Sequence, residues 1–176
     1  MKQLSILLVL VSLVGCRTKE RIENSKINLN KDKELIVQML TDRYNKFQNA
    51  SDPLEQAKIY VENLTEDAIW MYQNGAQIKG KANVRKWDEW FFSNYSLVVE
   101  KTFFDEPLIG SNIAVRRFIS VGYYIVKATG DSLRFNQKYE DVFHKVNGEW
   151  KIASHMWNSN NIDQSIWNLD STEYVF

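Results

Sequence analysis

The side chains best suited to proton transfer lie in the C-terminal part of the sequence. Glu140 and Asp141 are adjacent, and His144 and His155 are the only two histidines of the chain. Because side chains alternate across a strand, Glu140 and Asp141 are expected on opposite faces of a sheet. A carboxyl group in an apolar pocket has a raised pKa and can donate or accept a proton, and histidine is the side chain that ordinarily titrates near neutral pH.

Ordinary structural roles are the alternative for each of these groups. Arg116 and Arg117 are neighbours on a predicted strand, so the two arginines can neutralise two surface acids, whereas an arginine inside a pocket would pair with an acidic ligand. His155 has the opposite parity to Trp150 and Ile152, so it is expected on the other face of its strand. The histidines show no HxH or HExxH spacing, so neither a metal site nor a cofactor is predicted.

Aromatic side chains are abundant, at 13% of the residues with six tryptophans. Packing in an ordinary core is one explanation for them. If the fold encloses a pocket, these residues favour a flat or ring-bearing apolar ligand. The candidate wall residues are Tyr44, Trp70, Tyr72, Trp87, Trp90, Phe91, Tyr139 and Trp157, and Arg116 is a further candidate ligand contact.

Three helices are predicted in the first part of the chain that carries these residues. The first should begin after Asp32 as N-cap, and the second after Asp52 as N-cap with Pro53 in its first turn. Apolar residues at helical spacing support the helices over residues 32–47, 53–64 and 82–94.

Strands are predicted in the remainder of the chain. A short strand over residues 67–72 ends at Asn74-Gly75, and four long antiparallel strands follow over residues 97–104, 113–127, 133–146 and 150–157. Gly122 inside a strand indicates a bulge, and Asn147-Gly148 predicts a tight hairpin. This order predicts an α+β fold with helices on one face of an antiparallel sheet.

The N-terminus has the pattern of a bacterial lipoprotein precursor. Lys2 precedes an apolar run over residues 4–14, which is too short to span a bilayer and is typical of a signal peptide. The sequence Leu13-Val14-Gly15-Cys16 resembles a lipobox, which implies cleavage before Cys16 and acylation of that residue, the only cysteine of the chain. Several acyl chains on one residue hold a protein durably on a membrane.

The expected organisation has four parts. These are a signal peptide over residues 1–15, a lipidated cysteine with a polar tether over 16–31, a folded domain over 32–160 and a C-terminal tail over 161–176. The 22 basic and 22 acidic residues give no net charge, so nucleic acid is not an expected partner. Arg17 follows Cys16, which favours the outer membrane in a host with two membranes, facing the periplasm or the cell surface.

Three stretches in this order resemble the nuclear transport factor 2-like superfamily, and its SnoaL-like branch in particular. The resemblance covers roughly residues 33–158 and is carried by Glu66-Asp67-Ala68-Ile69-Trp70, by Gly75 with Ile78-Lys79-Gly80, and by 139–143 with 147–152. It implies a curved sheet wrapped around about three N-terminal helices into a cone, with an apolar pocket at the open end. Members of the superfamily often dimerise through the sheet and perform many unrelated functions.

The resemblance also implies where catalytic groups would lie. Isomerases of this type carry a carboxylate base at the position of Tyr72, and a phenol is a poor general base at neutral pH. Ketosteroid isomerase activity is therefore not expected. Their second acid corresponds to Glu140 or Asp141.

Three functions are compatible with the sequence. The first expectation is a lipid-anchored protein that binds a small apolar or aromatic ligand without catalysis. The second is an isomerase, hydratase or hydrolase that uses Glu140 or Asp141 with His155 or Tyr72. The third is an assembly module of an envelope complex that dimerises through its outer sheet face.

Overall fold

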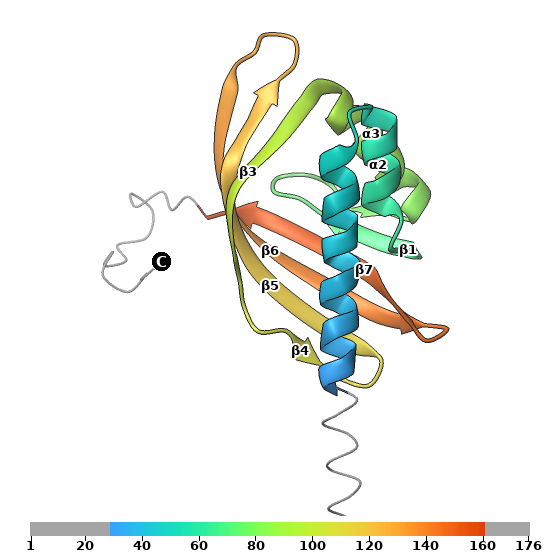
Figure 1. Cartoon of the computed structure of the whole chain (residues 1–176). Coiled ribbons are helices and arrows are strands. Elements are labelled where there is room, and N and C mark those ends of the chain that lie inside the picture. Colours follow the sequence, from blue (N-terminus) through green and yellow to red (C-terminus); the bar gives the residue numbers. More distant parts are fainter. Residues whose placement is uncertain (1–28, 161–176) are drawn as a thin grey trace, which may run out of the picture.

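A computed structural model describes residues 29–160 of the chain (Figure 1). The N-terminal helix is described over residues 29–49, and the other helices are α2 (Pro53–Val61) and α3 (Lys81–Asn94). The strands are β1 (Leu64–Met71), β2 (Ile78–Lys79), β3 (Tyr95–Phe104), β4 (Leu108–Ile109), β5 (Ile113–Val126), β6 (Ser132–Val146) and β7 (Glu149–Ser159). The predicted α+β class is confirmed.

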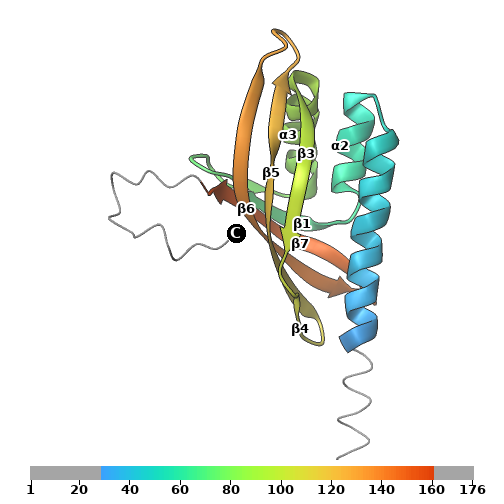
Figure 2. The ribbon, with the colours of Figure 1, turned by 60° about the vertical axis from the view of Figure 1, so that its left-hand side comes forward.

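All seven strands form one curved sheet, with the three helices on its inner side (Figures 1 and 2). The strand order is β2-β1-β7-β6-β5-β3, and β4 pairs with β5. The four predicted long strands pair antiparallel, whereas β1 runs parallel to β7, so the sheet is mixed. The two-residue strands β2 and β4 were not predicted, because each is too short for a recognisable alternation.

The predicted signal peptide, Cys16, most of the tether and the C-terminal tail lie outside the described residues. Residues 29–31, the last three of the predicted tether, belong to the N-terminal helix. Within residues 29–160, no helix combines the length and the apolar character needed to cross a membrane.

The two predicted N-caps have different outcomes. Asp52 caps α2 as expected, because its Oδ2 accepts a hydrogen bond from the Glu55 amide at 3.1 Å. The prediction for Asp32 is wrong, since Asp32 lies inside the N-terminal helix. Its buried carboxylate instead accepts hydrogen bonds from Lys145 Nζ at 2.6 Å and Trp150 Nε1 at 3.1 Å, and it joins the helix to the β6–β7 hairpin.

Two glycine positions shape the sheet as predicted. Asn147 and Gly148 have φ angles of 52° and 85°, the left-handed values that a tight hairpin turn requires. The β3–β5 register shifts beside Gly122, between Val99 and Lys101. A Cβ on Gly122 would lie 2.1 Å from the Val98 carbonyl oxygen, so only glycine permits this approach of the two strands.

The hydrophobic core fills one part of the space between helices and sheet. It contains Ile36 and Leu40 of the N-terminal helix, Val84 of α3, and Phe143 and Ile152 of the sheet, all buried. Aromatic side chains continue from this core along the inner face and enclose the candidate site.

Candidate functional site

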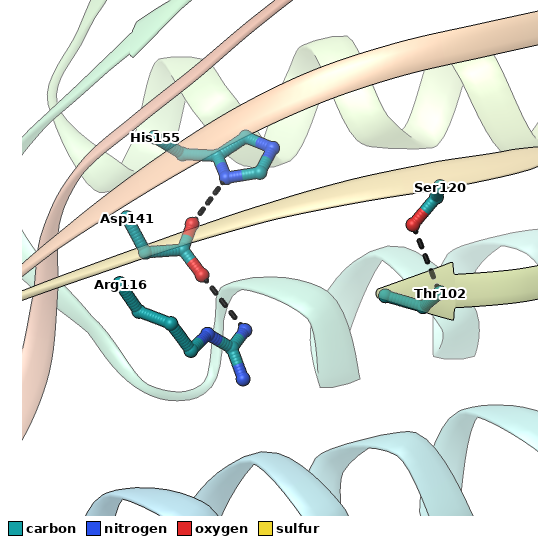
Figure 3. Close-up of polar contacts among 5 residues, drawn as sticks. All are labelled: Thr102, Arg116, Ser120, Asp141 and His155. Atoms are coloured by element: carbon teal, nitrogen blue, oxygen red, sulfur yellow. Dashed lines mark hydrogen bonds and ion pairs between the residues drawn. The ribbon is translucent and has the colours of Figure 1, made fainter. Parts of the chain in front are cut away.

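The centre of the inner face is a row of ionisable side chains from three neighbouring strands. Arg116 of β5 pairs in register with Asp141 of β6, which pairs with His155 of β7 (Figure 3). Arg116 Nη2 donates to Asp141 Oδ2 at 3.0 Å, and Asp141 Oδ1 lies 2.5 Å from His155 Nδ1. The row continues to Trp70 of β1, which pairs with His155.

His155 reaches this face because of a register shift in β7. Val142 pairs with Ser154 but Phe143 pairs with Ile152, so Ala153 is an extra residue in β7. The shift reverses the alternation beyond it, and both Ile152 and His155 are buried. The expectation that His155 faces away from Ile152 is therefore wrong, since simple parity does not account for a bulge.

Burial and charge act against each other at Asp141. The side chain is 1% exposed, and burial alone would raise its pKa. The charge and hydrogen bond of His155 and the charge of Arg116 outweigh that effect, so the pKa of Asp141 is lowered and the group is a carboxylate. Because the carboxylate accepts the Nδ1 proton, it fixes the orientation of the imidazole ring, and Nε2 is the nitrogen left for a ligand.

Glu140 lies on the outer face, as strand alternation predicts. Its Oε2 accepts a hydrogen bond from Arg117 Nε at 2.9 Å, and both side chains are solvent-accessible. Of the two adjacent acids, Asp141 therefore belongs to the inner face, and Glu140 makes a surface ion pair.

A cavity of about 330 Å³ adjoins this row at the end formed by His155 and Trp70. We call it the aromatic cavity. Its largest apolar walls are Trp70, Tyr72, Trp87, Phe91, Phe92 and Trp157. Its polar lining includes Tyr60, Asp88, Tyr124, Gln137, Tyr139 and His155.

The aromatic walls are in contact with one another around this space. Trp157 lies 5.7 Å from Tyr72 in a stacked arrangement and 5.6 Å from Trp70 edge-on, as ring-centroid distances. Trp87 stacks on Phe91 at 5.2 Å. Such offset and edge-on contacts hold the rings in fixed orientations, so the walls are preformed.

Most of the predicted wall residues line the aromatic cavity, but three candidate contacts do not. Tyr44 and Trp90 are exposed at 55% and 54%, because they lie on the outward sides of their helices. Arg116 is absent from the lining as well. Its guanidinium lies over the neighbouring rings of Phe104 and Phe118, at 4.7 and 4.9 Å from their centroids.

Asp88 of α3 is a lining residue that the sequence did not suggest. It is 1% exposed, and its Oδ2 has no hydrogen-bond partner among the described residues. Burial raises the pKa of Asp88 well above its ordinary value, although Arg43 opposes this. A recognisable signal was its helical spacing, since Asp88 shares a face with Val84 and Phe92, which are both buried.

Three tyrosines of the cavity, Tyr60, Tyr124 and Tyr139, are held as neutral phenols. Burial raises the pKa of Tyr60 to about 12 and also raises the pKa values of Tyr124 and Tyr139. The hydroxyls of Tyr124 and Tyr139 both donate to Gln137 Oε1, at 2.8 and 2.6 Å. A further pair of hydroxyls joins β3 and β5, where Thr102 and Ser120 are 2.9 Å apart (Figure 3).

Metal binding gains no support from the described residues. Within residues 29–160, no three histidine, cysteine, aspartate or glutamate side chains converge as a metal site would require. The chemistry available in the aromatic cavity is hydrogen bonding and proton transfer by Asp88, His155 and the tyrosines.

Comparison with known proteins identifies the fold. No protein-family model and no curated protein matches the sequence. A ketosteroid isomerase-like protein from Erwinia carotovora has a similar structure, with a TM-score of 0.65 at 16% identity, over 76% of this chain and 99% of that one. A protein from Novosphingobium aromaticivorans, provisionally named as a scytalone dehydratase, gives a TM-score of 0.60 at 16% identity, over 77% and 89%.

A third structure gives the fold its name. It is a nuclear transport factor 2-like protein with a cystatin-like fold, also from Novosphingobium aromaticivorans, with a TM-score of 0.59 at 15% identity over 81% of this chain and 90% of that one. At these identities the likeness concerns the fold. The described chain has the nuclear transport factor 2-like fold, as the sequence resemblance predicted.

Proposed function

We propose that this protein binds a small ring-bearing, largely apolar ligand in the aromatic cavity. The observation that carries the proposal is a preformed cavity of about 330 Å³ walled by Trp70, Tyr72, Trp87 and Trp157. Rigid aromatic walls with a few polar groups are typical of sites for small organic molecules. Flat rings can stack on these walls without reordering them, which lowers the entropic cost of binding.

The test is ligand binding by a soluble form that begins at residue 29. Naphthalene derivatives should raise the melting temperature and quench tryptophan fluorescence. Trp157→Leu should weaken this binding about tenfold or more, because it removes one wall. Trp90→Leu is the matched control, since Trp90 is 54% exposed and lies outside the lining. Equal effects of the two substitutions, or no binding by the parent protein, would refute the proposal.

A second candidate function is an enzyme that transfers protons, such as an isomerase, hydratase or hydrolase. It is favoured by the 2.5 Å contact between Asp141 and His155, because an oriented imidazole beside a cavity is suited to general acid–base catalysis. Two of the structural neighbours have names that include ketosteroid isomerase and scytalone dehydratase.

Deuterium exchange separates catalysis from binding alone. The protein would be incubated with aryl ketones in heavy water, and exchange beside the carbonyl group would be followed by NMR. Exchange that is catalysed by the parent protein and lost in His155→Gln would support an enzyme. Binding without exchange by any ketone tested would leave the non-catalytic function.

We further propose that the domain is anchored to a membrane through acylated Cys16, and in a host with two membranes to the outer one. The support is the apolar run over residues 4–14 followed by Leu13-Val14-Gly15-Cys16. Cells fed radioactive palmitate should label the full chain and recover it in the membrane fraction. Cys16→Ala should abolish the label, and a labelled Cys16→Ala protein would exclude this anchor.

A further inference from the structure

Asp88 has an environment unlike that of the other acids of the inner face. Asp141 has Arg116 and His155 as partners within 3.0 Å. Asp88 is equally buried, makes no ion pair or hydrogen bond within residues 29–160, and lines the aromatic cavity. A buried polar group without a partner costs free energy, so its presence in a cavity indicates a ligand that satisfies it.

We propose that the Asp88 carboxyl group makes the polar contact with the ligand, and that the aromatic cavity selects uncharged ring compounds with a hydrogen-bond-accepting oxygen, such as aryl ketones. This inference deepens the proposed ligand-binding function and rests on it. It assigns recognition of the ligand's polar atom to Asp88 of α3 rather than to the Arg116–Asp141–His155 row.

The hydrogen-bonding groups of the cavity that have no partner favour a ligand that carries an acceptor. Burial raises the pKa of Asp88 and so favours its uncharged form, which carries a donating O–H. Trp70 Nε1 is a second buried donor without a partner. The Gln137 side-chain oxygen already accepts two tyrosine hydroxyls, so it does not satisfy either donor. A ligand carbonyl would supply the missing acceptor.

The charges around Asp88 disfavour an ionic ligand. From the N-terminal helix, Arg43 lies over the Tyr60 ring at 5.0 Å and acts electrostatically on Asp88. This cation opposes an organic ammonium ion. Glu89, next to Asp88 on α3, opposes an anion. An uncharged molecule avoids both repulsions and the large cost of burying an ion.

The experiment measures the affinity of four naphthalene compounds by calorimetry: naphthalene, acetylnaphthalene, naphthoate and naphthylmethylamine. The parent protein should bind acetylnaphthalene about tenfold more tightly than naphthalene. Asp88→Leu should remove this advantage and keep naphthalene binding. Asp88→Asn should keep most of it, because the amide is an uncharged donor of the same shape. Glu140→Gln is the control and should change nothing, because Glu140 lies on the outer face of the sheet and outside the cavity lining.

The outcomes separate this inference from the proposed function. If naphthalene binds but acetylnaphthalene has no advantage that depends on Asp88, the inference is wrong and ring binding stands. Tighter binding of the amine that is lost in Asp88→Asn would make Asp88 a counter-ion and overturn the inference. If none of the four compounds binds, both proposals fail. Circular dichroism of each variant confirms that the fold is intact.

Discussion

Two ion pairs of the same chemistry occupy opposite faces of the sheet, one residue apart on the same two strands. Arg116 and Asp141 are 3.0 Å apart with side chains 13% and 1% exposed, whereas Arg117 and Glu140 are 2.9 Å apart with 59% and 33% exposed. Their geometry is nearly equal and their burial is not. Since water screens the outer pair and not the inner one, burial decides how much each pair contributes.

The largest expected effect is the loss of Asp141. Asp141→Ala leaves Arg116 buried without its carboxylate, and breaking a buried pair from one side typically costs about 3–5 kcal/mol. Chemical denaturation should show a loss of that size in the free energy of unfolding. A loss below about 1 kcal/mol would show that water reaches the inner row and would remove the contrast with the outer pair.

Removing the whole inner row should cost less than removing one member. In the triple variant Arg116→Met, Asp141→Leu, His155→Phe no charge is left without a partner, and apolar replacement of a buried ion cluster is often neutral or stabilising by about 1–4 kcal/mol. We expect its free energy of unfolding to exceed that of Asp141→Ala. A triple variant less stable than Asp141→Ala would mean that the row stabilises the fold beyond mutual neutralisation.

Asp88 extends the comparison to a buried acid with no basic partner within hydrogen-bonding distance. Asp88→Leu should stabilise the protein by about 1–3 kcal/mol at neutral pH, because a buried polar group without a partner is removed. The pKa is raised on folding, so stability linked to Asp88 is fully present below the unfolded value of 3.8 and declines as pH rises toward the folded pKa. The gain in Asp88→Leu should therefore grow with pH over that window, as measured by melting temperature.

The smallest effect is expected for the outer pair. Glu140→Gln should change the free energy of unfolding by less than about 1 kcal/mol, and by less still at high salt. Denaturation at low and high ionic strength measures both values. A salt-independent loss as large as that of Asp141→Ala would indicate that Glu140 is buried in solution, for example in a dimer through this face.

Local patterns predicted much of the fold. Helical spacing located the three helices, and the strand runs and Asn147-Gly148 located the long hairpins, because these signals depend on residues close in sequence. Asp52 was recognisable as a cap for the same reason. The parallel pairing of β1 with β7 was not predicted, since it joins residues that are at least 85 positions apart in the sequence, with no local signal.

The candidate site was less predictable, because it depends on which side chains of each strand lie on the inner face of the sheet. Strand alternation placed Glu140 and Asp141 on opposite faces of the sheet, but it could not show which of the two lies on the inner face. His155 was assigned to the wrong face because the extra residue Ala153 leaves no mark in the sequence. Asp88 escaped notice because a buried charge contradicts the rule that acids mark the exposed side of a helix.

The extra residue at Ala153 also divides β7 into two segments with opposite phase. Before it, Trp150 and Ile152 anchor the hydrophobic core, and after it His155 and Trp157 face the aromatic cavity. A one-residue insertion or deletion here would exchange the buried and exposed side chains of one segment while the other kept its partners. The bulge is thus a point at which a single length change could replace the ligand-facing surface of this strand with a different set of side chains.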